Sequence, residues 1–376
     1  MASCDKSDNP DYPYGKNAQS TVLLYSVASN NLEFSLNSDK NEILKGATQI
    51  DLNRNNILVY EVMNDHKPRL LRVVKKTSDS CIYEEVKEYD SNISSLAPER
   101  ISMVINDAVN LYPSESYGII LASHGTGPDP YFNSSRNSES SGVAAYSFGY
   151  DRDPSSSGHN EINIDDLADA IPDDLFHFIW FDACYMSNIE TIYEMRNKCD
   201  YYIGYPTEVY QWGMPYDLVM PYLATGKPDI TTAARVFFEY YSNNPSYYAR
   251  VATVAVVDMA KIEDVADFCK KVYDGNKSIS TSSLQNYARN AVGPFYDFGK
   301  YTLLKGDASG YEIDASEWQN ILDEFVIYKD ATPTDFNGRP IDLINYSGIS
   351  THNYDSTLQS EKEKYYRSLD WYKRVY

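Results

Sequence analysis

Nearly continuous apolar runs of strand length alternate along this chain with longer segments of helical spacing, and this alternation most constrains the fold. The runs lie at 21–27, 117–123 and 176–182. In residues 101–112, behind Pro98, Ile, Val and Ala recur instead at helical spacing. Because such apolar runs are typical of strands buried on both faces, we predict an α/β fold with a mostly parallel central sheet covered by helices on both faces.

The same pattern predicts three parts. We expect residues 1–19 to form a flexible N-terminal tether, 20–258 a core, and 259–376 a C-terminal extension packed on the core. Residues 126–160 are rich in Ser, Gly, Asn and Pro, which predicts a long exposed loop within the core. The remaining predicted strands are 56–62, 69–75, 142–151, 250–258 and 342–351, and the remaining predicted helices are 30–47, 162–171, 187–198, 259–274, 279–291, 314–328 and 361–375.

The charge of the chain argues against several classes of partner. Its 54 acidic and 33 basic residues give a formal net charge of -21, which repels nucleic acid phosphates and leaves no basic patch for an anionic membrane surface. No apolar run is long enough for a membrane-spanning helix. The charge favours a cationic ligand or substrate instead. The alternative is that the acidic residues serve only solubility.

The five cysteines suggest neither a disulfide framework nor a zinc site, because their number is odd and their spacing wide and irregular. The start, "MASC", resembles the junction left by a truncated bacterial lipoprotein signal, in which Cys4 is the lipidated residue. The alternative is an ordinary disordered terminus. The resemblance predicts an extracytoplasmic bacterial protein, secreted or anchored at the cell envelope by an N-terminal lipid.

Two apolar runs end in chemically competent residues. His124 follows the run at 117–123, and Cys184 follows the run at 176–182. Because the carboxyl ends of parallel strands converge, His124 is placed to act as the base for a Cys184 thiolate, with added support from a helix capped by Ser187. The alternative stays open, because a lone Cys after a core strand is more often structural and a lone His more often an ordinary polar residue.

The segments "LASHGTG" (121–127) and "FDACYMSN" (181–188) resemble the clostripain family of cysteine peptidases, relatives of caspases, legumains and gingipains. The resemblance extends to "GMPY" (213–216) and "YSGIST" (346–351) and covers about residues 20–376. It implies a caspase-like α/β/α sandwich with the C-terminal extension packed on it. It also implies that the catalytic dyad of the family falls on His124 and Cys184.

The resemblance further implies roles for other residues. The backbone N–H groups of Gly125 and Cys184 would form the oxyanion hole. Asp182 would be the acid at the floor of the pocket for the residue before the cut, and Thr207 would contribute to the pocket wall. An alternative for Asp182 is a strand-end side chain that caps nearby N–H groups.

Self-processing is a second implication, since many family members cut themselves between the catalytic His and Cys. The only Arg or Lys residues between His124 and Cys184 are Arg136 and Arg152. We expect cleavage after Arg152 and less readily after Arg136, the alternative being that both are ordinary loop residues. The dyad requires no cofactor. Some family members depend on calcium, and calcium stays an open option here although no EF-hand-like spacing occurs.

The sequence therefore predicts a cysteine endopeptidase that cuts after basic residues, chiefly Arg with Lys as a further candidate. Its partners are expected to be peptides or proteins with such residues. Two alternatives remain: a surface binding protein of the same fold whose catalysis is subordinate, and a cysteine hydrolase with a different first-pocket preference. Intact His124 and Cys184 argue against the first alternative, and Asp182 argues against an acidic preference because it would repel an acidic side chain.

Overall fold

The computed structural model describes residues 18–128, 147–152, 158–273, 275, 277–288, 295–353 and 361–376. Within these residues the large sheet contains β1 (Ala18–Val27), β2 (Asn55–Val62), β3 (Arg69–Thr77), β4 (Ser80–Glu88), β5 (Ser114–Ala122), β8 (Phe176–Asp182), β9 (Cys199–Gly204), β10 (Thr253–Asp258) and β12 (Val326–Ala331). Two small sheets pair β6 (Phe148–Arg152) with β7 (His159–Ile162) and β11 (Tyr296–Asp297) with β13 (Ser350–Thr351). The helices are α1 (Glu33–Ala47), α2 (Pro98–Leu111), α3 (Ile164–Ala170), α4 (Ile189–Glu194), α5 (Tyr216–Leu223), α6 (Ile230–Ser242), α7 (Ile262–Val272), α8 (Phe298–Ser309), α9 (Ala315–Phe325), α10 (Glu361–Ser368) and α11 (Asp370–Val375), with short 3-10 turns at Tyr247–Ala249 and Met259–Lys261.

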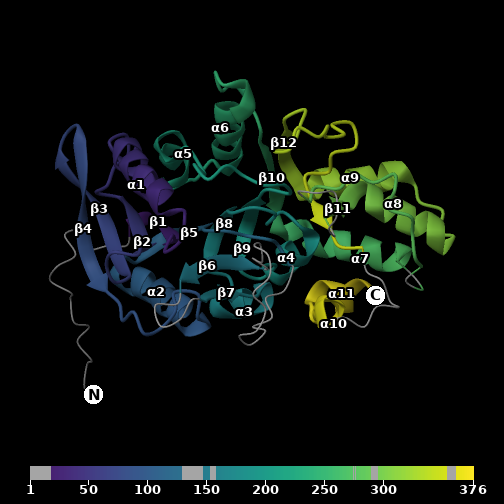
Figure 1. Cartoon of the computed structure of the whole chain (residues 1–376), viewed down its shortest axis with the longest axis horizontal. Coiled ribbons are helices and arrows are strands. Elements are labelled where there is room, and N and C mark those ends of the chain that lie inside the picture. Colours follow the sequence, from purple (N-terminus) through teal and green to yellow (C-terminus); the bar gives the residue numbers. More distant parts are fainter. Residues whose placement is uncertain are drawn as a thin grey trace, which may run out of the picture.

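The nine-stranded sheet has the order β12-β10-β9-β8-β5-β1-β2-β3-β4 (Figure 1). Its centre, from β9 to β2, is parallel throughout. Antiparallel pairings add β10 and β12 at one end and β3 and β4 at the other. The predicted α/β fold with a mostly parallel sheet is therefore confirmed.

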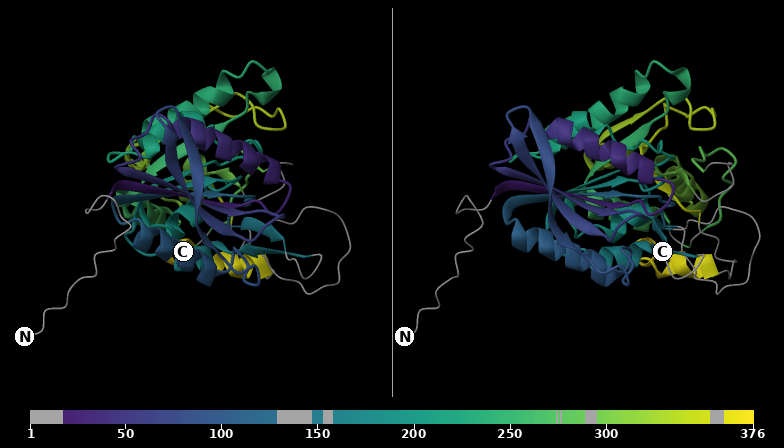
Figure 2. Two further views of the ribbon diagram at one scale, coloured as in Figure 1. Left: turned by 90° about the vertical axis from the view of Figure 1, so that its left-hand side faces the viewer. Right: turned by 60° about the vertical axis from the view of Figure 1, so that its left-hand side comes forward.

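Helices cover both faces of this sheet. Helices α1, α5 and α6 lie on one face and α2 and α3 on the other, as the turned views also show for the purple helix α1 and the blue helix α2 (Figures 1 and 2). Alternate residues of β1 serve the two layers: Val22 and Leu24 pack into the core beneath α1, and Leu23 and Tyr25 pack into the opposite core. Burial on both faces explains why these strands read as nearly continuous apolar runs.

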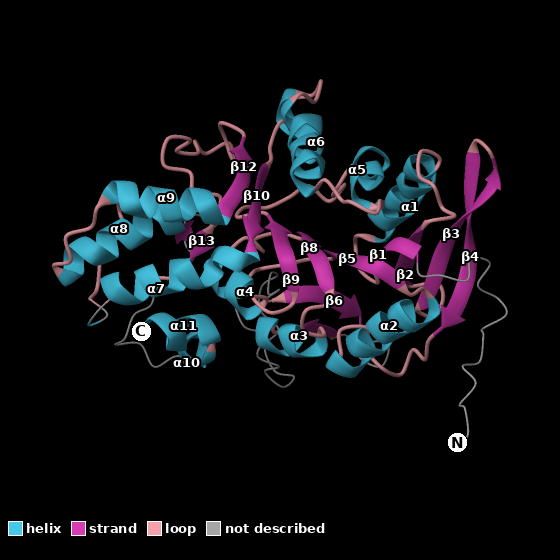
Figure 3. Cartoon of the chain, turned by 180° about the vertical axis from the view of Figure 1, so that it is seen from behind, coloured by secondary structure: helices cyan, strands magenta, loops and turns pink. Residues whose placement is uncertain are grey.

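The C-terminal helices continue one of these cores beyond the end of the sheet. Helices α7, α8 and α9 lie past β10 and β12 (Figure 3). Trp318 and Trp371 from this region are buried in the same cluster as Leu23 of β1. Strand β12 belongs to the region 259–376 and pairs with β10 of the region 20–258. The predicted division at 258 stays a prediction.

Several predicted elements were wrong. The helix expected at 314–328 ends at Phe325, because the chain turns there into β12 and pairs with β10. Residues 279–288, the described part of the helix expected at 279–291, contain no helix. A side chain there takes a backbone N–H group, because Asn286 Oδ1 accepts from Ala288 N–H at 2.8 Å. The strand expected at 342–351 shrinks to β13.

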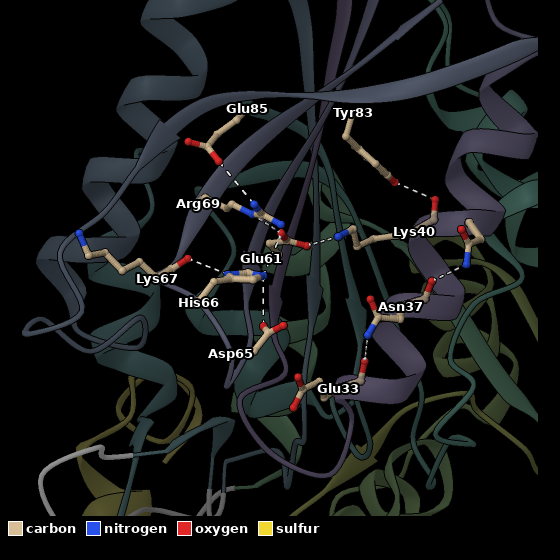
Figure 4. A network of polar contacts seen from close by, with 11 residues as sticks. Glu33, Asn37, Lys40, Glu61, Asp65, His66, Lys67, Arg69, Tyr83 and Glu85 are labelled. Carbon is tan, nitrogen blue, oxygen red and sulfur yellow. Dashed lines mark hydrogen bonds and ion pairs between the residues drawn. The ribbon is translucent and has the colours of Figure 1, made fainter. Parts of the chain in front are cut away.

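A buried carboxylate ties α1 to the edge of the parallel strands. Glu61 of β2 has a fully buried side chain, and its two oxygens contact Lys40 Nζ of α1 and Arg69 Nε of β3, each at 2.5 Å (Figure 4). His66 Nε2 lies 3.4 Å from Glu61 Oε1. Removing one partner from such a group leaves buried charge without compensation.

We expect Glu61→Ala to lower the free energy of unfolding by about 3–5 kcal/mol, since Lys40 and Arg69 lose their shared acid. Urea unfolding followed by circular dichroism measures the loss. The matched control is Glu85→Ala, which removes a half-exposed partner of the same Arg69 and should cost less than about 1 kcal/mol. Equal losses in both variants would contradict this assignment.

Among the described helices, none combines the length and apolar character needed to cross a membrane.

Candidate active site

Three neighbouring parallel strands end at one edge of the sheet and bring the predicted pair together. Ala122 of β5 is in register with Ser26 of β1 on one side and with Asp182 of β8 on the other. His124 and Cys184 each lie two residues beyond the paired positions. Both line the same cavity, which has a volume of about 420 Å³. The cavity walls are residues 26–28, 31, 32, 35, 36, 39, 122–124, 182, 184, 208–213 and 336.

Cys184 lies in a tight turn whose backbone is strained. The next residue, Tyr185, has φ +60, a left-handed conformation that is unfavourable for a bulky side chain. Its N–H donates to the Thr207 carbonyl at 3.0 Å, its carbonyl accepts from Asn188 Nδ2 at 2.6 Å, and its ring stacks on Phe295 with centroids 4.9 Å apart. These contacts hold the turn that presents the half-buried Cys184 thiol to the cavity.

The helix after Cys184 differs from the prediction. Its N-cap is Asn188, whose Oδ1 accepts from Thr191 N–H at 2.9 Å, whereas the Ser187 hydroxyl donates to the Gly348 carbonyl. Ser187 as a cap was therefore wrong, and α4 has only six residues, too few for a strong dipole. A backbone N–H group contacts the sulfur in place of the helix N-terminus: the Val209 nitrogen lies 3.4 Å from Cys184 Sγ.

His124 is half-buried, and burial lowers the pKa of its imidazole below the ordinary 6.5, so the ring is neutral at pH 7. Its Nε2 lies 2.7 Å from Asn31 Oδ1. Because that oxygen only accepts, the neutral ring carries its proton on Nε2 and keeps a lone pair on Nδ1. Asn31 thus orients the ring as a base.

Sequence reasoning missed Asn31, although one rule would have found it. Asn31 follows β1, just as His124 follows β5 and Cys184 follows β8. These three strands are neighbours in the sheet, so polar residues after each of them meet at the same edge.

Gly125 allows the two loops of the site to touch. A Cβ on Gly125 would lie 2.7 Å from the Cys184 carbonyl oxygen and 3.0 Å from the Ala183 Cβ. Only a residue without a side chain permits this approach. The backbone of Gly125 also pairs with Phe148 of β6, which fixes the loop after His124.

Asp182 is a buried residue of the cavity lining, and its partners come from far along the chain. Its Oδ2 accepts from Met214 N–H at 3.0 Å and from the Tyr216 hydroxyl at 2.9 Å, and its Oδ1 faces the Tyr205 hydroxyl at 3.4 Å. Burial raises the pKa of Asp182, and these donors oppose that shift. Gly213, at φ +57, keeps the approach open, because a Cβ there would lie 2.6 Å from Oδ2. The carboxyl is therefore not a cap for neighbouring N–H groups.

The remaining predicted residues are dispersed. Thr207 does not line the cavity; it is buried behind the wall, and its hydroxyl lies 2.8 Å from that of Thr253. Arg152 ends β6 with an exposed side chain, and its N–H donates to the Ser29 hydroxyl at 3.1 Å. Arg136 and Cys4 lie outside the described residues. Of the described cysteines, Cys81, Cys199 and Cys269 are buried and free, and Cys184 alone is partly exposed.

The cavity wall is acidic. Besides Asp182 it contains Asp39 and Glu208, which sequence reasoning did not single out, and no Lys or Arg of the described chain lines it. No described group of three or more His, Cys, Asp or Glu side chains is arranged to hold a metal ion. The cavity therefore contains a thiol, a neutral imidazole and buried carboxyl groups.

A thiol and an imidazole at the carboxyl edge of an α/β/α sandwich define the class of caspase-like cysteine peptidases. The family model described as the clostripain family, Peptidase_C11, matches residues 24–364. The chain belongs to the clostripain family of cysteine peptidases.

Solved structures agree with this assignment. A secreted C11 cysteine protease from Bacteroides thetaiotaomicron, in complex with an irreversible peptide inhibitor, is 27% identical, with a TM-score of 0.79 over 95% of this chain and 99% of that one. An inactive zymogen C11 protease from Parabacteroides distasonis is also 27% identical, with a TM-score of 0.79 over 96% of this chain and 99% of that one. Among the curated proteins, none matches this chain.

We expect Asn31→Asp to raise the pKa of His124 by about one to two units, because a carboxylate beside Nε2–H favours the protonated ring. NMR titration of the imidazole C–H signals measures the shift, and His124→Gln identifies the relevant signal. Asn30→Asp is the matched control, since Asn30 binds the Tyr150 carbonyl and Leu32 N–H instead. Equal shifts in the two variants would show that general charge, not this contact, sets the pKa.

Proposed function

We propose that this cysteine peptidase is an endopeptidase that cuts after basic residues, chiefly Arg with Lys as a further candidate. The observation that carries the proposal is the buried Asp182 carboxyl in the same cavity as Cys184 and His124. A carboxylate in a largely desolvated pocket binds a guanidinium bidentately or an ammonium as a point charge. The acidic wall and the net charge of -21 both favour a cationic peptide.

The dyad accounts for the reaction in two steps. His124 takes the thiol proton on Nδ1, and the Cys184 sulfur attacks the scissile carbonyl carbon. The imidazolium then gives its proton to the leaving amine, and a thioester remains on Cys184. A water activated by His124 hydrolyses the thioester, which releases the acid product and restores the thiol.

The charge that develops on the substrate oxygen needs donors. The backbone N–H groups of Gly125 and Cys184 are the proposed oxyanion hole, supported by the close approach of these two loops. Preorganised donors of this kind contribute several kcal/mol to transition-state stabilisation, on the order of 3 kcal/mol each. The mechanism uses no metal or cofactor.

Peptides that differ only in the residue before the cut test the proposal. We expect the wild type to cut after Arg and Lys and not after Asp, Asn or citrulline, and Cys184→Ala and His124→Ala to be inactive. Asp182→Asn should lower kcat/KM for Arg by about 100-fold or more, because a buried charge pair is lost. Asp200→Asn removes an exposed acid that pairs with His177 and should change nothing. Cleavage after Asp alone would overturn the pocket assignment.

We also propose self-processing after Arg152, with Arg136 as the less favoured site. Two features support Arg152. Its side chain is exposed, and its strand lies beside the site, where Gly149 N–H donates to the His124 carbonyl at 2.8 Å. Cleavage there would leave two chains joined through the large sheet, because β5 and β8 lie on opposite sides of the cut.

We expect the wild-type chain to convert on incubation into two fragments whose first ends at Arg152, and Arg152→Ala to lose that end. Intact mass spectrometry gives the cut position directly. Cys184→Ala should stay whole, and Arg136→Ala should mature like the wild type. If Arg152→Ala still matured at the same bond, the assignment would be abandoned.

The proposed setting is extracytoplasmic, either secreted or anchored through a lipid on Cys4. The Bacteroides thetaiotaomicron relative is described as secreted, which supports this setting. The substrates are then peptides or proteins with basic residues that reach the cell envelope.

A further inference from the structure

The cavity holds a second buried acid that the proposed function leaves without a role. Asp39 lies on α1 with 9% of its surface exposed, and it lines the same cavity as Cys184, His124 and Asp182. Within the described part of the chain, no hydrogen bond or ion pair reaches its carboxyl. Because Asp39 lines the cavity and its carboxyl has no partner in the described chain, a ligand that enters the cavity can bind it.

Asp39 occupies a position that packing alone would give to an apolar residue. The buried side of α1 contains Leu36 and Ile43 at helical spacing on either side of it. Asp182 follows Phe178 and Trp180 at alternate positions of β8, and those two residues pack in the core beneath α1. The helix and the strand therefore direct two acids into the same cavity, where the charge of Asp182 acts on Asp39.

Both lysines of α1 are engaged elsewhere. Lys40, the next residue of α1, is turned toward Glu61 on β2 (Figure 4), and Lys45 pairs with Asp217. Glu42, one turn further along α1, accepts from Tyr216 N–H at 3.0 Å. No Lys or Arg in the described residues neutralises Asp39.

Burial, and then the nearby carboxylates of Asp182 and Glu42, raise the pKa of Asp39 to about 9. Asp182 accepts from three donors and Asp39 from none in the described chain, so the negative charge of the pair rests on Asp182 and Asp39 holds a proton at neutral pH. The other titratable groups around Asp39 are the phenols of Tyr83, Tyr216 and Tyr241, which burial keeps protonated, and the cavity residues His124, Cys184, Glu208 and Tyr210.

We propose that Asp39 is a second acid of the primary specificity pocket and binds the charged end of the substrate's Arg or Lys side chain together with Asp182. The inference rests on the proposed preference for basic residues and adds a specificity residue from a different element. An arriving cation replaces the proton of Asp39, which leaves to solvent, so the net charge of the site is unchanged. A guanidinium has five N–H donors and suits two carboxylates in this way.

The exchange makes binding depend on pH in a defined direction. Below about pH 9 the cation must displace the Asp39 proton, and this requirement weakens binding by up to about tenfold for each pH unit of acidification. Affinity for a cationic side chain should therefore rise between about pH 6 and pH 9, with release of up to about one proton per ligand bound. A neutral ligand of the same shape should show neither effect.

The test uses the full chain carrying Cys184→Ala and two peptides, acetyl-Ala-Ala-Arg-amide and its citrulline counterpart. Isothermal titration calorimetry in two buffers of different ionisation enthalpy gives the affinity and the number of protons released. We expect release with the Arg peptide only. Adding Asp39→Asn should abolish the release and weaken Arg binding by about 10- to 100-fold near pH 9, because a charge-assisted contact is lost.

Glu33→Gln is the matched control, since Glu33 is another acid of α1, binds the Asn64 side chain and does not line the cavity. It should keep the proton release. If the wild type cuts after Arg and Lys and depends on Asp182, yet Asp39→Asn binds and releases protons as before, the role of Asp39 is wrong while the proposed function stands. If the wild type shows no preference for Arg or Lys, both are overturned.

Unfolding separates a binding role from a structural one. The folded-state pKa of Asp39 is raised from the ordinary 3.8, so its contribution to stability is lost progressively as pH rises from about 4 to about 9. Asp39→Asn should therefore have a melting temperature at or above that of the wild type near neutral pH. Weaker Arg binding in a variant of undiminished stability supports the proposal, and a marked fall in melting temperature contradicts it.

Discussion

The alignment of β1, β5 and β8 is the constraint on which the rest of the site depends. Ser26, Ala122 and Asp182 lie side by side in register, so the next few residues of each strand leave the sheet at the same edge. Backbone hydrogen bonds of the parallel sheet thus set the spacing of Asn31, His124 and Cys184. The register of these strands is fixed, because a strand that is buried on both faces cannot shift along its neighbour without exposing apolar side chains. The short segments that follow the strands therefore keep this spacing.

Around this edge the structure contains several locally unfavourable features. Tyr185 holds a left-handed backbone next to the thiol, Asp182 is a desolvated carboxyl, and Asp39 is a buried acid without a donor in the described chain. Strain and unpartnered polar groups persist only where surrounding packing stabilises them, and they cluster at functional sites. The apolar layers of α1, α5 and α6 on one face and α2 and α3 on the other supply that packing.

Much of the framework was predictable, because both the central strands and the pair of reactive residues leave local signals. The runs at 21–27, 117–123 and 176–182 correspond to β1, β5 and β8, and His124 and Cys184, which follow two of these strands, line one cavity. Predictions failed where tertiary pairing overrides local preference. Residues 326–328 continue a helical pattern in sequence and join β10 in space instead. Ser187 has capping-box spacing, but Asn188 is closer to the first turn and takes the role.

By itself the sequence determined the α/β class, the two motifs and the candidate thiol and imidazole, since burial periodicity and residue chemistry are local properties. Tertiary structure decided which side chains share the cavity. Thr207, close to the motif in sequence, was placed behind the wall, whereas Asn31 and Asp39, more than 80 residues from His124, were brought to the site. The physical reason is that the order of strands in a sheet and the face on which a helix packs are set by contacts between distant segments, and no local pattern records them.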